Sequence, residues 1–472
     1  MAHAVGYRSF AAPRPGCARK ASQTKVCATM LFDEALKYLL SLGHETLSIK
    51  LGLENTETLL ESLGNPHQDF RKVQIAGTNG KGSTAAFLES ICRHAKIRTG
   101  LFTSPHLVSI TERIKIQGER ISENEFARHT TTVKETADRL VEQGELQTLP
   151  TFFEHVTAIA LLAFREARVE LAILETGLGG RLDSTTAAQA EVVAITPVAM
   201  DHEEYLGSTI AEIAAEKAAI IRPGVAAVIG PQTPEALEVI IRRCEAQGIQ
   251  PAIIETSEVS HLGGATADGR CELVFENAPG HNEKLNLGLR GRHQIDNALV
   301  AVALAESLSK RGFPISQTAI VHGLETAKHP GRLELWTCKP PLLFDGAHNP
   351  AAARTLQDYL VEFVKSPVTM IFGAMKDKRL LEMASLLFPL ANELILTEID
   401  NPRATSLVDL IGTVPSAMDR NKISTVPSVS EAVIKAREIT PDDGLICITG
   451  SLYLIGAAQE ILNSRSAGAQ FE

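Results

Sequence analysis

A glycine-rich segment near the start of the chain restricts its fold more than any other feature. The segment reads AGTNGKGST; it follows a compact apolar stretch, Arg71–Ala76, and opens a stretch of helical spacing at residues 83–96. Between a strand and a helix, glycines let backbone N–H groups turn toward a phosphate, while a lysine and the helix N-terminus add positive charge. The spacing differs from a standard Walker A loop, so a plain glycine-rich turn is the alternative. The context favours a phosphate site formed by Thr78, Asn79, Gly80, Lys81, Gly82 and Ser83.

Beyond this loop, short β-branched stretches alternate with segments of helical spacing. Strands are expected at 71–76, 169–175 and 191–196, and helices at 151–167 and 209–221. Such alternation predicts an α/β fold, here a P-loop-type domain with a mainly parallel sheet covered on both faces. Around residues 271–289, two alternating segments flank a polar turn, which predicts a small antiparallel addition.

The tripeptide His329-Pro330-Gly331 interrupts the pattern as a linker would, and the alternation then restarts. This predicts a second, smaller Rossmann-like α/β domain, with strands at 341–344, 368–372, 393–397 and 445–449 and helices at 351–363 and 378–388. The expected organisation is a basic arm at 1–30, a central domain with the phosphate loop at 31–328, a linker at 329–333 and a C-terminal domain at 334–472.

The charge balance and the cysteines exclude several classes of protein. Lys and Arg number 46 and Asp and Glu 56, a net charge of −10, whereas proteins that grip a nucleic-acid backbone carry a basic surplus. The seven cysteines are scattered without a C-x-x-C pair, which indicates reduced thiols rather than a disulfide or zinc framework. No apolar run approaches the roughly 20 residues that span a bilayer. We therefore expect a cytoplasmic protein with neither nucleic acid nor a membrane as its partner.

Residues 1–30 differ from the rest of the chain, because they include five basic residues and no acidic one. They also lack the apolar core of a secretory signal. A disordered, dispensable arm, or an upstream start with the true start at Met30, is favoured over an organelle transit peptide. Two prolines near the middle of the arm would interrupt the amphipathic helix that a mitochondrial signal needs.

Polar residues at the ends of expected strands are the next candidates for chemistry. Glu175 ends the apolar strand of LAILETGLGGRLD, and the loop after it exposes Arg181 and Asp183. Open α/β sheets bind ligands at the carboxyl ends of their strands, and a carboxylate beside a phosphate loop suits Mg²⁺. A helix-capping or ion-paired glutamate is the alternative. His202 follows the next strand, in DHEEYLG, where its position favours a metal ligand over a structural histidine.

Lys217 lies on an expected helix whose neighbours are mostly alanine and isoleucine. Such a lysine typically extends its amine to solvent, but a desolvated one has a lowered pKa and a reactive neutral amine. The second domain adds PGRLE at the linker, and DGAHNP and GAMKDK after expected strands. None of these motifs is specific alone.

Together the motifs resemble the Mur ligase superfamily and, within it, the folylpolyglutamate synthase/dihydrofolate synthase family. The similarity runs from about Ala35 to Gly456, and GTNGKGS, TSPHL with TERI, ETGLGGRLD, DHEEYLG, EKAAIIRPG, PGRLE, DGAHNP and GSLYLIG occur in the order typical of the family. One departure is Ser184-Thr185-Thr186, where many members read Ala-Thr-Asn, so the substrate loop has lost an amide.

The resemblance implies roles for individual residues. ATP would be bound by the phosphate loop together with Asn297, Arg332 and Asp345. Two Mg²⁺ ions would be held by Ser104, Glu175, His202 and a carbamate on Lys217. The residues implied to be catalytic are Lys81, His202, Lys217 and His348, the last near the acyl phosphate. The substrate would contact residues 42–53 and Thr151, Phe152, Phe153, Glu154, Arg181, Asp183 and Tyr453.

The implied reaction is an ATP-dependent ligation. The carboxylate of a pterin substrate attacks the γ-phosphate, and the amine of L-glutamate then attacks the acyl phosphate. A bifunctional enzyme acting on dihydropteroate and on reduced folates is the first hypothesis, and polyglutamylation alone is the second. An inactive nucleotide-binding module is disfavoured because the catalytic set is complete. A cell-wall Mur ligase is disfavoured because the roughly forty residues before the loop leave no room for a uridine-nucleotide domain. Domain closure about the linker and a monomer are expected.

Overall fold

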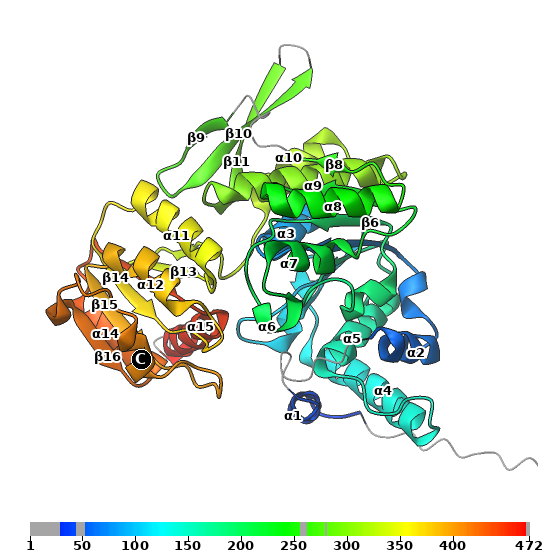
Figure 1. Ribbon diagram of the computed structural model, residues 1–472, viewed down its shortest axis with the longest axis horizontal. Helices are drawn as coiled ribbons and strands as arrows, with labels where there is room; N and C mark the ends of the chain where they lie inside the picture. Colours follow the sequence, from blue (N-terminus) through cyan, green and yellow to red (C-terminus); the bar gives the residue numbers. More distant parts are fainter. Residues whose placement is uncertain (1–28, 44–51, 255–261, 279–280, 469–472) are drawn as a thin grey trace, which may run out of the picture.

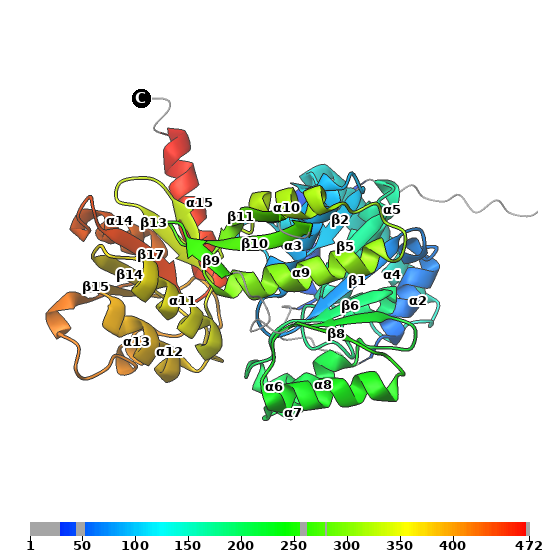
Figure 2. The same cartoon turned by 90° about the horizontal axis from the view of Figure 1, so that it is seen from above.

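The computed structural model describes residues 29–43, 52–254, 262–278 and 281–468. Two mainly parallel sheets dominate the structure, and they lie on opposite sides of Figures 1 and 2. The larger sheet has the strand order β4-β3-β2-β5-β1-β6-β7-β8, with antiparallel pairing only at β3 and β4. Its strands are β1 (Arg71–Ala76), β2 (Thr99–Phe102), β3 (Ile114–Ile116), β4 (Glu119–Arg120), β5 (Leu171–Glu175), β6 (Val192–Ile195), β7 (Ala226–Ile229) and β8 (Ala252–Ile253).

Helices cover both faces of the larger sheet. One face carries α3 (Lys81–His94), α9 (His293–Ser309) and α10 (Gln317–Thr326). The other carries α1 (Phe32–Ser41), α2 (Glu54–Ser62), α4 (Glu123–Glu142), α5 (Phe152–Glu166), α7 (Ile210–Ala218) and α8 (Pro234–Ala246). The alternation along β1 decides the two sides: Val73 and Ile75 join the first core, whereas Gln74 points to the other face.

Three antiparallel strands stand beside the larger sheet, in the order β11-β10-β9. They are β9 (Leu262–Ala265), β10 (Arg270–Ala278) and β11 (His281–Arg290). Leu285, Leu287 and Leu289 of β11 join the core under α9 and α10, which anchors the addition. The predicted antiparallel addition is present, with a third strand that was not predicted.

The smaller sheet has the strand order β12-β13-β17-β14-β15-β16, with β12 antiparallel at its edge. Its strands are β12 (Glu334–Trp336), β13 (Leu342–Asp345), β14 (Val368–Phe372), β15 (Glu393–Thr397), β16 (Ile423–Val426) and β17 (Leu445–Thr449). One face packs against α11 (Pro350–Phe363), α12 (Leu380–Leu387) and α13 (Leu407–Gly412), and the other against α14 (Val429–Ile439) and α15 (Leu452–Gly468).

The predicted α/β class with two mainly parallel sheets is therefore confirmed, and the differences lie at element ends. The helix expected at 209–221 begins one residue later, because Thr209 caps it through its side chain, and it ends at Ala218. The helix expected at 378–388 begins at Leu380, because the backbone of Arg379 is not helical. Within the described residues no helix has the length and apolar character needed to cross a membrane.

Candidate active site

The phosphate loop leaves β1 at the carboxyl edge of the larger sheet and enters α3. Gly80 has a left-handed backbone (φ 86°), and a side chain there would collide with the amide of Asn297, so only glycine fits. Lys81 is the first residue of α3, and its Nζ donates to the carbonyls of Gly77 and Thr78 at 3.1 and 3.2 Å. The loop thus holds its own lysine at the helix N-terminus, where a phosphate would compete with the two carbonyls for the ammonium group.

Two other segments hold the loop in place. The backbone N–H groups of Thr78 and Asn79 donate to one carbonyl of the segment after β6, at 3.0 and 3.1 Å. From α9, Gln294 donates to Ser83 Oγ at 3.2 Å and accepts from Asn297 Nδ2 at 2.9 Å. The structure therefore places Asn297, a predicted ATP contact, beside the loop. Gln294 was missed, although it belongs to the same HQIDN motif.

Glu175 ends β5 directly beside the loop and is 5% exposed. Its Oε2 accepts from the backbone N–H of Ser104 at 3.3 Å, and a Cβ at Gly82 would lie 3.4 Å from the same atom. Burial raises the pKa of Glu175, and the nearby Lys81 opposes that shift. A buried carboxylate thus stands next to the position that a bound phosphate would occupy.

His202 begins the short helix α6 (Glu203–Leu206), with a left-handed backbone of φ 52°. Burial lowers the pKa of His202 to about 4, although the neighbouring Asp201 opposes the shift. The imidazole is therefore neutral at pH 7, and a neutral ring nitrogen is the form that binds a metal ion.

Asp201 joins the two sides of the site and is 9% exposed. Three groups of the C-terminal part converge on its carboxylate: Lys378 Nζ at 2.8 Å, Asn349 Nδ2 at 3.1 Å and His348 Nε2 at 3.5 Å. Burial alone would raise the pKa of Asp201, but His348, His202 and Lys378 hold it well below its usual value. Within the DHEE cluster His202 was predicted as a site residue and Asp201 was not, because the partners of Asp201 are far away along the chain.

Lys217 is 4% exposed, near the end of α7. The glycine-rich loop touches this helix end at Gly180, where a Cβ would lie 2.9 Å from the carbonyl oxygens of Glu216 and Lys217. Within the described part of the chain, no carboxylate forms an ion pair with the Lys217 amine. Burial lowers the pKa of Lys217 to about 7, and the charge of Lys81 acts in the same direction. The amine is therefore partly neutral at pH 7.

The C-terminal part faces these groups with the linker and the start of α11. Asp345 accepts from the backbone N–H groups of Leu333 and Ala347, both at 3.0 Å, so it braces the linker. Burial raises the pKa of Asp345, and Arg332 opposes the shift. His348 is oriented by its Nδ1 contact with the Gly346 carbonyl at 2.8 Å.

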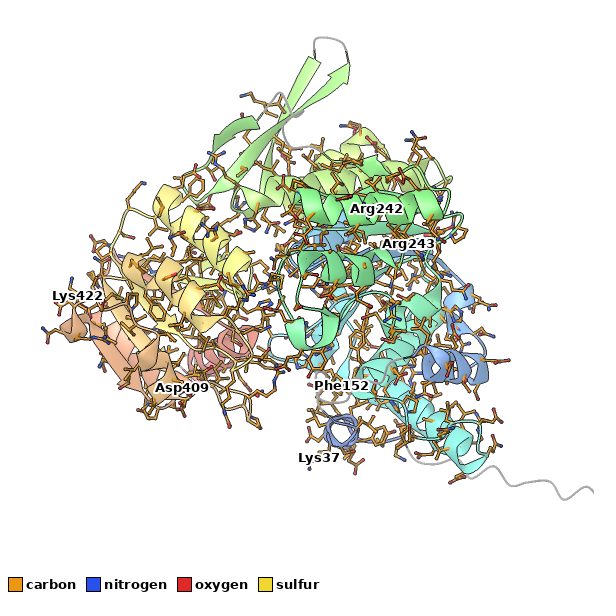
Figure 3. The ribbon with its side chains drawn as sticks, viewed as in Figure 1. Lys37, Phe152, Arg242, Arg243, Asp409 and Lys422 are labelled. Carbon is orange, nitrogen blue, oxygen red and sulfur yellow. The ribbon has the colours of Figure 1, made fainter. Side chains whose placement is uncertain are left out.

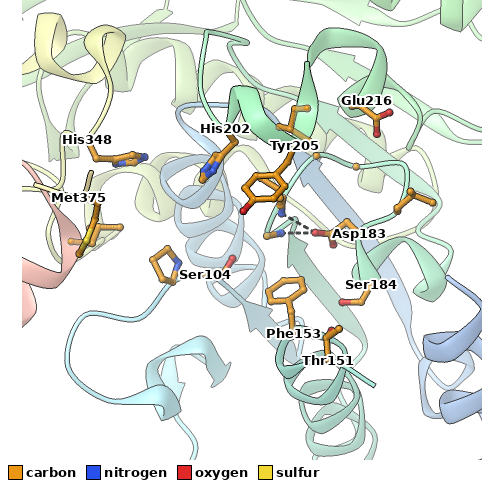
Figure 4. A pocket seen from close by; sticks show the side chains of 18 of the residues that line it. Ser104, Thr151, Phe153, Asp183, Ser184, His202, Tyr205, Glu216, His348 and Met375 are labelled. Atoms are coloured by element: carbon orange, nitrogen blue, oxygen red, sulfur yellow. Dashed lines mark hydrogen bonds between the residues drawn. The ribbon is translucent and has the colours of Figure 1, made fainter. Parts of the chain in front are cut away.

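The predicted nucleotide and metal residues line one cavity of about 170 Å³. Its walls include the phosphate loop together with Ser104, Glu175, His202, Lys217, Asn297, Arg332, Asp345 and His348. A second, larger cavity of about 310 Å³ (Figure 4) shares Ser104, His202 and His348 with the first. Among the residues predicted to bind substrate, it is lined by Thr151, Phe153, Glu154, Arg181, Asp183 and Tyr453. The two cavities thus meet at the boundary between the two parts of the chain.

The two adjacent phenylalanines that were predicted to bind substrate point in different directions. Phe153 lies against Gly177, where a Cβ would fall 2.5 Å from its Cζ, and it faces the cavity (Figure 4). Phe152 (labelled in Figure 3) does not line the cavity: it is 4% exposed, belongs to the core, and carries the Arg113 guanidinium 5.4 Å from its ring centre. Consecutive helical residues point about 100° apart, and here this step turns Phe152 toward the core and Phe153 toward the cavity. Residues 44–51 of the predicted pterin stretch lie outside the described residues.

Two carboxylates that were predicted to bind substrate accept hydrogen bonds from the protein's own backbone. Asp183 accepts from the backbone N–H groups of Gly177 and Leu178 at 2.8 and 3.0 Å (Figure 4) and from that of Thr185 at 3.0 Å. Glu154 caps α5 by accepting from the Thr151 N–H at 2.7 Å. Both carboxylates therefore shape the cavity wall.

Ser184 and Thr186, which stand where many members have Ala and Asn, also face inward, as does Thr185 between them. Gln74 donates to the hydroxyls of Thr185 and Thr186 at 2.9 and 2.7 Å, and Thr157 and Ser184 share a hydrogen bond of 2.5 Å. All of these side chains are buried. These hydrogen bonds tie the loop after Asp183 to β1 and α5.

The donor set fits a divalent cation that is held jointly with phosphates. Among the described residues, no three His, Cys, Asp or Glu side chains come together as a complete metal site. Mg²⁺ is usually bound by one or two carboxylates, with water and substrate phosphates completing its shell. Glu175 and the neutral His202 line the same cavity as the phosphate loop, which is what such a shared site requires.

Comparison with known proteins agrees with this geometry. The Mur ligase middle domain matches residues 75–305, and the Mur ligase glutamate ligase domain matches residues 331–452. Dihydrofolate synthase/folylpolyglutamate synthase of Bacillus subtilis is 35% identical over 423 residues, which are 88% of this chain and 95% of that protein. A probable bifunctional folylpolyglutamate synthase/dihydropteroate synthase of Halobacterium salinarum is 36% identical, and the match covers 91% of this chain but about half (51%) of that protein.

Solved structures match over the whole fold. Mycobacterium tuberculosis folylpolyglutamate synthase complexed with ADP has a TM-score of 0.83 and 30% identity, and covers 91% of this chain and 98% of its own. A bifunctional folylpolyglutamate synthase/dihydrofolate synthase with Mn, AMPPNP and L-glutamate bound has a TM-score of 0.77 and 29% identity, over 92% and 98%. Since the likeness extends over nearly the full length of several relatives, this chain belongs to the folylpolyglutamate synthase/dihydrofolate synthase family of Mur ligases.

Proposed function

We propose that this protein is an ATP-dependent ligase of folate metabolism that joins L-glutamate to dihydropteroate and to reduced folates. One observation carries the proposal: the cavity of the phosphate loop and the cavity of Phe153 meet at Ser104, His202 and His348. A carboxylate held in the second cavity would reach the terminal phosphate of a nucleotide held in the first. The names of the Bacillus relative and of the ligand-bound structures support the same substrates.

The reaction has two steps. The substrate carboxylate attacks the γ-phosphorus in line, the bond to the ADP oxygen breaks, and an acyl phosphate forms. The α-amine of glutamate then attacks the acyl carbon, phosphate leaves, and the amine gives up a proton as the amide forms. The chain's own contribution to the first step is to place the phosphates on the loop N–H groups and to hold Lys81 against the charge that develops. Arg332 lines the same cavity from the opposite side.

We assign Ser104, Glu175, His202 and Lys217 to the divalent cations. When bound there, a cation such as Mg²⁺ would neutralise charge on the phosphate oxygens. Glu175 and neutral His202 supply an oxygen and a nitrogen ligand. Lys217 supplies one only if its neutral amine has taken up CO₂, losing a proton and becoming an anionic carbamate. Its burial without a carboxylate partner, and its pKa of about 7, support this assignment.

The C-terminal groups bear on the second step. His348 and Asn349 directly precede α11 and contact Asp201 across the site. This contact keeps the acyl-phosphate region covered, and excluding water there protects an activated carboxyl group from hydrolysis. We therefore assign His348 to the place where glutamate meets the acyl phosphate.

The activity test uses ADP release in two parallel reactions. One contains dihydropteroate and glutamate, the other tetrahydrofolate and glutamate, each with ATP and Mg²⁺. Glutamate-dependent turnover in both reactions is expected for the bifunctional enzyme. Turnover with tetrahydrofolate alone would restrict the protein to polyglutamylation, and no turnover in either would overturn the proposed function.

Glu175→Gln tests the metal assignment. The amide keeps the size of the side chain but loses the charge, so the Mg²⁺ concentration for half-maximal activity is expected to rise about tenfold or more. Glu89→Gln is the control, because Glu89 is also buried but bonds to Thr99 away from the cavity. A Mg²⁺ profile that is unchanged in Glu175→Gln would remove Glu175 from the metal site.

A further inference from the structure

The three-stranded addition contacts α11 of the C-terminal part, and the function proposed above gives it no role. Figures 1 and 2 both show one end of this addition near α11, and in Figure 1 the addition rises above the two large sheets. Tyr359 of α11 donates its hydroxyl to the backbone carbonyl of Asp268, in the turn before β10, at 3.0 Å. The next residue, Gly269, lies so close to the Tyr359 ring that a Cβ would collide with it. The turn and the helix are therefore in direct contact.

The turn is rigid on its own side. Gly269 has a left-handed backbone (φ 78°), which favours glycine at this position independently of the close contact. The carboxylate of Asp268 accepts from Arg290 at 2.9 and 3.2 Å, and the Gly269 carbonyl accepts from the Gly291 N–H at 2.8 Å. Tyr359 is 5% exposed, and burial raises its pKa to about 12, so the phenol stays protonated and donates at any working pH.

A second contact lies beside the first. Arg292 directly precedes the first residue of α9 and forms a bidentate ion pair with Glu362 of α11, with N–O distances of 2.6 to 3.0 Å. The same end of α9 carries Gln294, whose amide holds Ser83 of the phosphate-loop helix. A continuous path of contacts therefore runs from the phosphate loop through α9 to α11.

The other end of α11 reaches the active site. Asn349 caps this helix and donates to Asn79 of the phosphate loop and to Asp201, both at 3.1 Å. A helix rises about 1.5 Å per residue, so Tyr359 lies roughly 15 Å from Asn349 along the axis of α11. A small rotation at the Tyr359 end therefore shifts the catalytic end by an ångström or more.

We propose that the Asp268–Gly269 turn and Arg292 form a pivot for α11, and that Tyr359 and Glu362 are positioning residues that set His348 and Asn349 against the phosphate loop. This inference rests on the proposed function. The antiparallel addition then acts as the fixed side of the hinge, since its strands are anchored in the core under α9 and α10. A loosened pivot would leave acyl-phosphate formation in place but admit water, which converts the acyl phosphate back to carboxylate and free phosphate.

Charge reversal tests the pivot, because both partners are partly exposed, with 50% and 38% of their side chains accessible. Arg292→Glu and Glu362→Arg are each expected to lower kcat about tenfold. In both variants the ADP released per amide formed should rise above one, while the Kd for ATP stays within about twofold. The double variant restores the ion pair in reverse, so both quantities are expected to return to within about twofold of the parent chain. Tyr359→Phe, which removes only the hydroxyl, should raise the same ratio.

The matched control is Arg242→Glu on the outer surface of α8 (Figure 3), which breaks an exposed ion pair with Glu238 away from the hinge. It should leave kcat and the ratio unchanged. An unchanged ratio in the single reversals, or a loss that the double variant does not restore, would overturn the pivot.

X-ray scattering on the same variants separates this outcome from failure of the proposed function. If the parent chain releases no ADP with glutamate, wider interdomain distances in the single variants, restored in the double, still support the pivot; unchanged distances overturn it.

Discussion

Replacing Lys217 by alanine is expected to lower kcat by about a hundredfold to a thousandfold, the range seen when one charge-stabilising group is removed from an active site. The side chain is buried in the nucleotide cavity and has no carboxylate partner among the described residues, so a permanent ammonium group there would be costly. A carbamate would replace the buried ammonium group by an anion, which the nearby Lys81 and a bound cation can compensate, and it would supply an anionic oxygen to the metal site. A short carboxylic acid should partly restore activity in Lys217→Ala, because it can occupy the vacated space with the same type of oxygen.

Lys217→Arg separates the carbamate from a simple positive charge. Arginine keeps the charge but stays protonated, so it cannot take up CO₂, and it should be as inactive as alanine. Labelled bicarbonate should give a carbamate signal by NMR in the parent chain and in neither variant. Since the pKa of Lys217 is about 7 and only the neutral amine reacts, loading with CO₂ should slow as the pH falls below 7. Full activity in Lys217→Arg would disprove the carbamate.

Removing the carboxylate of Asp201 should have the second large effect. Asp201→Ala removes the 2.8 Å partner of Lys378 and leaves it with Asp377, whose carboxylate lies 3.4 Å away. The Asp201 and Lys378 side chains are both less than a tenth exposed. Loss of one partner of a buried ion pair costs about 3–5 kcal/mol when the remaining charge is uncompensated. Because Asp377 still compensates Lys378 in part, the free energy of unfolding should fall by an amount near the lower end of that range. kcat should fall as well, because His348 and Asn349 lose the group that holds them over the site.

A double-mutant cycle measures this coupling. Lys378→Met removes the buried ammonium group that has lost Asp201. Adding this change to Asp201→Ala should therefore lower the free energy of unfolding by less than the sum of the two single changes. Glu238→Gln, on an exposed pair, is the control and should change stability by less than about 0.5 kcal/mol. If the two single changes in the free energy of unfolding add up to that of the double variant, Asp201 and Lys378 are not coupled.

The contribution of the same ion pair to the stability of the folded chain should decrease at acidic pH. The pKa of Asp201 is lower in the folded chain than its unfolded value of about 3.9, so its stabilisation is complete above that value and is lost as the pH falls through the folded pKa. The stability difference between the parent chain and Asp201→Asn should therefore be constant from neutral pH down to about 4 and shrink below it. Unfolding midpoints in urea, measured across this range, provide the check.

Short-range sequence patterns were enough to predict the fold class and the positions of the candidate residues on the larger sheet. The phosphate loop is contiguous, and its glycines, lysine and helix start occupy neighbouring positions, so the sequence predicts its geometry directly. Glu175 and His202 could be placed for a related reason: parallel strands bring their carboxyl ends to one edge, and each residue follows such a strand. Lys217 could be singled out because a lysine among alanines is locally unusual.

Side-chain direction was decided only by packing. TFFE contains two adjacent phenylalanines, and nothing in their order tells which one faces the cavity; Phe153 does, while Phe152 fills the core beneath Arg113. Asp183 and Glu154 have the charge expected of substrate ligands, but the folded loop and helix use their oxygens for backbone N–H groups. Whether a carboxylate is available to a ligand depends on which donors the fold brings to it.

The sequence by itself determined the two mainly parallel α/β units, the phosphate loop and the strand-end residues of the site, because each depends on neighbours within a few positions. Only the tertiary structure decided how the units meet. Asp201 is hydrogen-bonded to Asn349 and Lys378, which are 148 and 177 residues away in the sequence, and Tyr359 is hydrogen-bonded to Asp268, which is 91 residues away. Such pairs leave no local pattern, since each partner alone is an ordinary polar residue and its role arises only when two separately folded sheets are brought together.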